Sequence, residues 1–152
     1  MSTMDAHRCF RAVLTALSLP GRPQASPVPP ERTPGLVLAA IWEPDQVGDA
    51  VRLVRGDPGP WLLEEVPRGT EAEPQLGGTV VVVPDRDGPR TGVRLAGPGL
   101  REPTPAVLPL SREALESRAR ACAEPPAGID LVIVTAAGSI VGLPRTTRVE
   151  ID

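Results

Sequence analysis

The sequence predicts an α/β domain in which helices cover both faces of a mixed β-sheet. Two runs of consecutive apolar residues, TVVVV at 79–83 and LVIV at 131–134, lack the alternation expected of a strand with one wet face. Both are therefore predicted to be central strands. Segments with helical periodicity precede and separate them. The chain has 152 residues, 41% of them hydrophobic, which suits one domain, 1–152, with a packed core.

The N-terminal part is predicted to form two helices joined by a stiff connection. Residues 3–19 have apolar side chains at helical spacing, and we expect that face to be buried. Its members are Ala6, Phe10, Val13, Leu14 and Leu17. The proline-rich connection at about 20–34 favours extended backbone. Thr33 as a cap and Pro34 at the first helical position then favour a short buried helix that stops at Pro44.

The middle of the chain has weaker patterns. Residues 45–55 are predicted as an amphipathic helix capped by Asp45. Its inner face would consist of three valines, Val47, Val51 and Val54. The segment WLLEEV at 61–66 is interpreted as a short strand and residues 67–78 as a loop.

The C-terminal half alternates strands with one helix. After the strand at 79–83, the turn PDRDGP leads into a second strand, RTGVRLAG at 90–97. Ser111 is a suitable N-cap for a helix that continues to about Ala123, and Leu115, Ala119 and Cys122 are expected to face inward. Two more strands, IDLVIVT at 129–135 and SIVGLP at 139–144, close the chain.

Composition excludes several classes of function. A net charge of -3 and only three aromatic side chains argue against a nucleic-acid partner. No apolar run approaches the roughly 20 residues of a membrane-spanning helix, and we expect a cytoplasmic protein with Cys9 and Cys122 reduced. All sixteen basic residues are arginine. Without lysine, no Schiff base with pyridoxal phosphate and no lysine-dependent phosphate loop can form, so we expect no bound cofactor.

Metal and hydrolase sites find little support. His7 is the only histidine and Cys9 the only thiol near it, whereas zinc usually takes three or four protein ligands, so no metal site is predicted. No G-x-S-x-G motif is present, and no acidic residue is paired with a nucleophile at a familiar spacing, so the catalytic residues stay unknown.

Two segments are candidates for binding an anion. Arg145, Thr146 and Thr147 follow a predicted buried strand and combine a guanidinium fork with two hydroxyl donors, which is suited to phosphate. The alternatives are an edge strand with solvated charges, or an Arg145 paired with a nearby acid such as Asp130.

The second candidate segment is RLAGPGLRE at 94–102. Gly97 and Gly99 belong to a Gly-Pro-Gly turn that follows a strand containing Arg94 and precedes Arg101, and successive backbone amides in such a turn can form an anion-binding nest. The alternative is an ordinary turn at the end of a strand.

Four blocks in one order resemble a known family. They are FRAVLTALSLPG at 10–21, GTEAEPQLGGTVVVV at 69–83, RLAGPGL at 94–100 and GIDLVIVTAAGSIVGLPRTT at 128–147. Together they resemble the PhnH family, a component of the bacterial phosphonate carbon-phosphorus lyase system. Two departures stand out: the region from Trp42 to Gly78 is shorter than in the family, and ALSLPG replaces A-M-S-x-P-G.

The resemblance implies a fold similar to the large domain of type I pyridoxal phosphate enzymes, but without the cofactor. It also implies a homodimer within a complex with subunits G, I and J, and with L for an ATP-dependent step. That step makes α-D-ribose 1-methylphosphonate 5-triphosphate from ATP and methylphosphonate. The alternatives from other classes are a stand-alone anion-binding or regulatory module and a divergent enzyme that acts alone.

Overall fold

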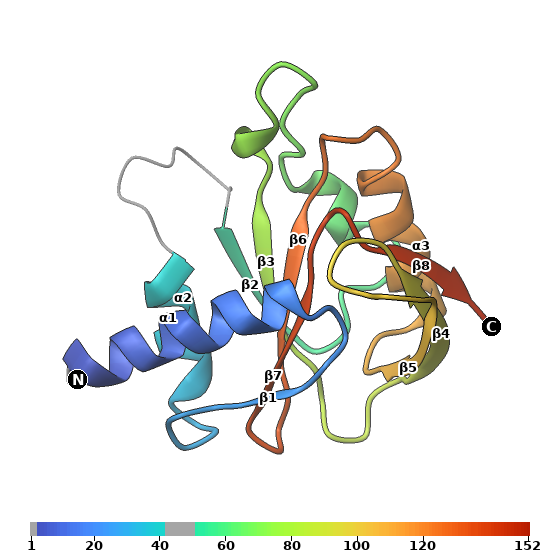
Figure 1. Ribbon diagram of the computed structural model, residues 1–152. Coiled ribbons are helices and arrows are strands. Elements are labelled where there is room, and N and C mark those ends of the chain that lie inside the picture. Colours follow the sequence, from blue (N-terminus) through green and yellow to red (C-terminus); the bar gives the residue numbers. More distant parts are fainter. Residues whose placement is uncertain (1–2, 42–50) are drawn as a thin grey trace.

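The computed structural model describes residues 3–41 and 51–152 and has an α/β architecture (Figure 1). Its elements in chain order are α1 (Thr3–Ser18), β1 (Gln24–Ala25), α2 (Thr33–Ile41), β2 (Val51–Arg55), the 3₁₀ helices η1 (Leu62–Glu65) and η2 (Pro74–Leu76), β3 (Thr79–Val83), β4 (Thr91–Ala96), β5 (Thr104–Leu108), α3 (Arg112–Ala121), β6 (Asp130–Val134), β7 (Ser139–Leu143) and β8 (Arg148–Ile151). The strands form a five-stranded mixed sheet and a three-stranded antiparallel sheet.

The mixed sheet has the strand order β1-β7-β6-β3-β2. Strands β2, β3 and β6 are parallel, whereas β7 is antiparallel to β6 and β1 is antiparallel to β7. Val81 at the middle of β3 lies between Leu53 of β2 and Val132 of β6. Both central strands are buried on their two faces, which confirms the prediction from their uninterrupted apolar runs.

Helices α1 and α2 cover one face of this sheet (Figure 1). Side chains from the two helices pack there against alternate residues of the strands. The cluster consists of Val13, Ala16, Val37, Val81, Val132, Val134 and Ile140. The prediction of a buried helix after the proline-rich connection is confirmed by α2, whose Leu36 and Val37 are buried.

The opposite face is covered by α3, η1 and the antiparallel sheet β5-β4-β8. Leu63 of η1, Leu95 of β4 and Leu115 of α3 join Val82 and Ile133 of the main sheet in the largest apolar cluster. Ser111 caps α3, since its side chain accepts a hydrogen bond from the Ala114 amide, as predicted. Strands β5 and β8 had no counterpart in the sequence prediction.

Two element predictions in the middle of the chain are wrong. Residues 51–55 form strand β2 rather than the end of a helix, because Val51 to Arg55 pair in parallel register with β3. The rest of that predicted helix, residues 45–50, lies outside the described residues. The segment at 61–66 contains η1 instead of a strand, since Leu63 and Val66, three residues apart, are the ones that face the core.

The inward faces of two helices also differ from prediction. In α1 the buried residues are Cys9, Val13 and Ala16, while Phe10 and Leu14 are 41% and 49% exposed. Gly142 of β7 accounts for the small side chains on the inward face of α1. It lets the backbone of α1 approach β7 so closely that small side chains fill the interface. In α3, Ala119 is exposed and Arg118 is buried in its place. Within the described residues, no helix has the length and apolar character needed to cross a bilayer.

The close approach of α1 to β7 generates a stability prediction. A Cβ at Gly142 would collide with the Ala16 carbonyl group and with the Leu17 amide nitrogen. We therefore expect Gly142→Val to lower the free energy of unfolding by about 1 to 3 kcal/mol through overpacking, measured by urea denaturation. The matched control is Gly35→Ala in α2, where a Cβ meets open space and should be neutral or stabilising. Equal stabilities for the two variants would contradict the packing argument.

Candidate functional site

The predicted PRTT segment lies at the amino ends of the parallel strands. Strand β7 is antiparallel to β6, and Leu143 at its end pairs with Leu131 near the start of β6. Residues 144–147 therefore follow β7 at the same edge of the sheet where β6 begins with Asp130. We call this the amino edge, and the opposite one, where β2, β3 and β6 end, the carboxyl edge.

Arg145 is bonded to Asp130, the acid that the sequence offered as an alternative to anion binding. The Arg145 backbone amide donates to Asp130 Oδ1 at 2.8 Å, Nε donates to the same oxygen at 3.3 Å, and Nη2 donates to Oδ2 at 3.1 Å. Both side chains are mostly buried. The pair therefore fixes the first residue of β6 to the chain that leaves β7.

The same guanidinium reaches the loop before β3. Arg145 Nη1 donates to the Pro74 carbonyl oxygen at 2.6 Å, and Nη2 lies 3.4 Å from the Gly77 carbonyl oxygen. Gly77 suits this arrangement, because a Cβ there would collide with Arg145 Nη1 and with the Gly128 carbonyl oxygen. Arg145 thus connects η2, β6 and the end of β7, and all three of its side-chain nitrogens have acceptors.

A second arginine at this edge was missed by sequence reasoning. Arg118 of α3 is 2% exposed, and its Nη2 donates to the carbonyl oxygens of Pro144 and Thr147 at 2.8 and 2.9 Å. Burial lowers the pKa of the Arg118 guanidinium. Its Nε and the Thr147 hydroxyl have no hydrogen-bond partner among the described residues. The sequence could have indicated that Arg118 is buried, because it lies three residues after Leu115 and therefore on the same face of the helix.

These residues border a pocket of about 540 Å³, which we call the amino-edge pocket. Four of the six anion-binding candidates line it together with Arg118: Gly97, Arg145, Thr146 and Thr147. Arg94 and Gly99 do not. Arg94 is exposed on β4 between the buried Val93 and Leu95, and Gly99 packs beside Ser18. Anion binding by these residues stays a prediction.

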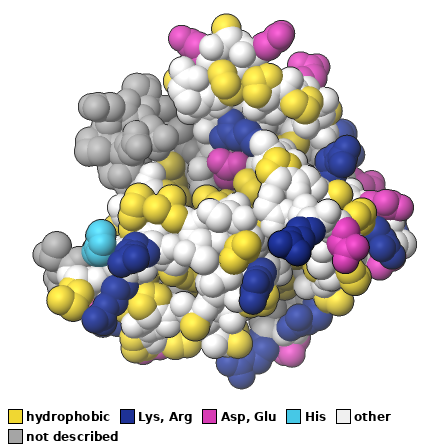
Figure 2. Space-filling model, in the orientation of Figure 1, with side chains coloured by type: hydrophobic (Ala, Val, Ile, Leu, Met, Phe, Trp, Pro, Cys, Tyr) yellow, Lys and Arg dark blue, Asp and Glu magenta, His cyan; other side chains and the backbone are white. Residues whose placement is uncertain are grey.

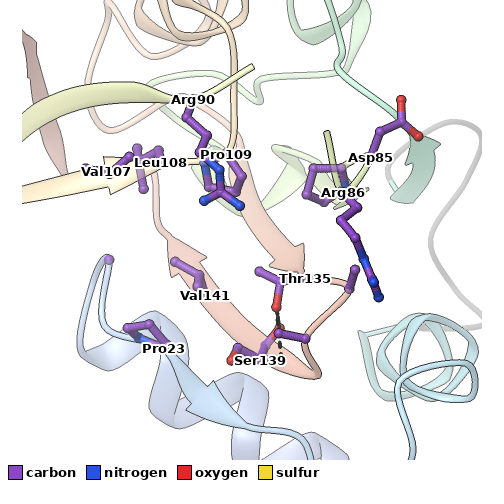
Figure 3. A pocket seen from close by; sticks show the side chains of 14 residues that line it. Pro23, Asp85, Arg86, Arg90, Val107, Leu108, Pro109, Thr135, Ser139 and Val141 are labelled. Carbon is purple, nitrogen blue, oxygen red and sulfur yellow. Dashed lines mark hydrogen bonds between the residues drawn. The ribbon is translucent and has the colours of Figure 1, made fainter. Parts of the chain in front are cut away.

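A different pocket opens at the carboxyl edge, and the sequence reasoning did not identify it (Figure 3). This carboxyl-edge pocket has a volume of about 300 Å³. Arg86 and Arg90 come from the loop between β3 and β4, Thr135 comes from the turn between β6 and β7, and Ser139 is the first residue of β7. Ligands of α/β sheets bind outside the carboxyl ends of strands, so the usable signal was the turn after the predicted strand at 79–83, which contains Arg86 and leads into Arg90.

The first helix provides no metal site. His7 is exposed, Cys9 is buried, and burial raises the pKa of the Cys9 thiol. Within residues 3–41 and 51–152, no three His, Cys, Asp or Glu side chains are grouped as metal ligands would be.

The contacts of Arg145 generate a prediction about stability. Arg145→Ala should lower the free energy of unfolding by about 3 kcal/mol, because it leaves Asp130 and the Pro74 carbonyl group without their guanidinium donor. Arg101→Ala is the control, since Arg101 is exposed and has no partner in the described part of the chain, so a change within about 0.5 kcal/mol is expected. Thermal unfolding of both variants checks this. Indistinguishable melting temperatures would show that the pair contributes nothing.

Comparison with known proteins agrees with the family resemblance of the sequence. A search of curated proteins finds no match to this chain. A family model described as bacterial phosphonate metabolism protein (PhnH) matches residues 53–150, about two thirds of the chain. The match begins in β2 and ends in β8, so it includes β3, β6 and β7, both arginines of the carboxyl-edge pocket and the Asp130–Arg145 pair. The chain therefore belongs to the PhnH family and has a role in bacterial phosphonate metabolism.

Proposed function

We propose that the protein is a non-autonomous component of the bacterial carbon-phosphorus lyase complex. In this role it supports the synthesis of α-D-ribose 1-methylphosphonate 5-triphosphate from ATP and methylphosphonate. The observation that carries the proposal is the family match over 53–150, which runs from within β2 to within β8. The partners would be subunits G, I and J, with L for the ATP-dependent step.

The surface of α1 supports association with other chains. Met4, Phe10 and Leu14 are exposed on this helix, and at about 100° per residue they fall within an arc of roughly 120°. Figure 2 shows hydrophobic side chains at the surface of this face of the molecule, interspersed with arginines. We propose that the three side chains contact a second copy of the chain in a homodimer.

Chemistry on pyridoxal phosphate is not part of the proposal. The sequence contains no lysine, so no side-chain amine can form the Schiff base. The similarity of the fold to the large domain of type I pyridoxal phosphate enzymes stays a prediction. In this proposal the chain contributes binding and assembly, and the reacting groups of the synthesis come from the assembled complex.

Growth on methylphosphonate tests the proposed function. Deleting the gene should abolish growth with methylphosphonate as sole phosphorus source and leave growth on phosphate unchanged, since only the first requires the complex. A plasmid copy should restore growth, and the chain carried on that plasmid with an affinity tag should co-purify with subunits G, I and J. Unimpaired growth of the deletion strain, or purification of the chain alone in phosphorus-starved cells, would favour a stand-alone module.

Light scattering tests the homodimer. The purified chain should have twice its monomer mass, and Leu14→Glu should shift it toward the monomer because a charge would be buried in the apolar contact. Thr15→Glu is the matched control on the same helix, since Thr15 is exposed and lies outside the apolar arc. A wild-type chain that is monomeric at micromolar concentration would contradict the proposal.

A further inference from the structure

We propose that the carboxyl-edge pocket binds the phosphonate or phosphate group of a small ligand, with Arg86 and Arg90 as its cationic side chains. This deepens the proposed function and rests on it for the biological ligand. The pocket lies where β3 and β6 end, which is the edge at which open α/β sheets hold their ligands (Figure 3). Nothing in the family match assigns a ligand to these residues.

The loop between β3 and β4 brings the two arginines to one pocket. The Gly88 amide donates to the Asp85 carbonyl oxygen at 3.0 Å, which closes a turn of residues 85–88 that contains Arg86 and comes just before Arg90. Pro84 and Pro89 restrict the backbone on each side of this turn. Both guanidinium groups therefore extend from a short, constrained loop. Because the loop is already restricted, it would lose little conformational entropy when an anion binds.

Neither arginine is neutralised by the residues that the structure describes. Arg86 and Arg90 are exposed, and no ion pair or hydrogen bond occupies their side chains within that part of the chain. Arg118, Arg120 and Arg145 differ, because each donates hydrogen bonds to carboxylate or carbonyl oxygens. Unused guanidinium donors at a pocket are the groups that bind a phosphonate or phosphate in bidentate geometry.

Among the described residues, Asp85 is the one acid that lines this pocket, and its carboxylate is directed elsewhere. Asp85 belongs to the lining, but its side chain extends away from the pocket in Figure 3. Its Oδ2 lies near the end of β2, 3.3 Å from the position that a Cβ on Gly56 would take. Among the described residues, the charged side chains of the lining are thus two cations and one anion, and the anion is directed toward Gly56 after β2. The field inside the pocket favours a negative ligand.

The turn between β6 and β7 supplies further donors on the opposite wall. Thr135 Oγ1 accepts the Ser139 amide at 3.1 Å, and the Gly138 amide donates to the Thr135 carbonyl oxygen at 3.0 Å. The Ala136 and Ala137 amides at the tip donate to no acceptor within the described residues, and both residues line the pocket. Backbone amides in a fixed turn can bind an anion opposite the arginines.

The size and remaining walls of the pocket limit the ligand to a small molecule. Its volume of about 300 Å³ is at the lower end of the range of about 300 to 1,000 Å³ for small-molecule sites. Val107, Leu108 and Val141 give it an apolar wall, against which a methyl group can pack. A phosphonate with a short alkyl group matches both the cationic and the apolar walls.

Titration of the purified full-length chain with methylphosphonate at low ionic strength, followed by amide NMR, tests the site. The Ala136 and Ala137 amide signals should shift in a saturable way, and Arg86→Gln and Arg90→Gln should each weaken binding roughly tenfold. Arg101→Gln removes an exposed arginine that does not line the pocket and should leave binding and melting temperature unchanged. Absence of saturable shifts, or equal binding by all three variants, would overturn the proposal.

Inorganic phosphate in a parallel titration identifies the group that is recognised. Tighter binding of methylphosphonate assigns the ligand as an alkylphosphonate that uses the apolar wall, and equal binding assigns recognition to the oxyanion alone. The same variants on the complementing plasmid separate this proposal from the proposed function. If the variants lose binding but still support normal growth on methylphosphonate, the pocket is a binding site that the complex does not need for this growth. If growth on methylphosphonate depends on the protein but no binding is measured, the proposed function would stand and the pocket proposal would be overturned.

Discussion

The parallel pairing of β3 with β6 is the constraint on which the rest of the structure depends. Both strands are buried on their two faces, so no polar side chain can lie along them without losing its hydration. Charged groups are therefore restricted to the two edges where these strands begin and end. The direction of the strands then determines which polar segments of the sequence meet at each edge.

The buried arginines of the amino edge differ in their contacts from the two loop arginines of the carboxyl edge, although the exposed Arg148 also lines the amino-edge pocket. At the amino edge, Arg118 and Arg145 are largely buried and donate to a carboxylate or to carbonyl groups, so they connect α3, η2 and the ends of β6 and β7. At the carboxyl edge, Arg86 and Arg90 are exposed and have no acceptor in the described part of the chain. An arginine with satisfied donors contributes to stability, whereas one with unused donors at a pocket is available to a ligand. This contrast separates Arg145, whose three side-chain nitrogens all have acceptors, from Arg86 and Arg90.

Sequence patterns predicted the strands best where burial is complete. The runs at 79–83 and 131–134 are rich in β-branched residues, which favour strands, and their continuous apolar character is typical of strands covered on both faces. Residues 51–55 were assigned to a helix, since Val51 and Val54 are also compatible with helical spacing, and only pairing with β3 decides between the two. Strands β5 and β8 are short and mostly exposed edges of the second sheet, and local sequence carries little information about such pairing.

The candidate site was harder to predict, because the role of each arginine depends on whether its segment lies at the amino edge or at the carboxyl edge of the sheet. Arg145 followed a buried strand and looked available, yet the antiparallel turn of β7 returns it to Asp130 at the amino edge. Arg86 and Arg90 also follow a buried strand, but that strand runs parallel to its neighbours and ends at the carboxyl edge. Local sequence does not state strand direction, so the two cases could not be separated without the topology. Arg118 was not singled out from the sequence, because helical periodicity assigns charged side chains to solvent unless their partners are known.

The central claim is that arginines stabilise the amino edge and bind a ligand at the carboxyl edge. A crystal structure of the full chain grown with methylphosphonate tests this most directly, because it locates the phosphorus relative to both edges. The account predicts a tetrahedral group between the Arg86 and Arg90 side chains, opposite the turn at 135–139, with the Asp130–Arg145 pair intact. Methylphosphonate bound instead to Arg145, with its contact to Asp130 broken, would contradict it.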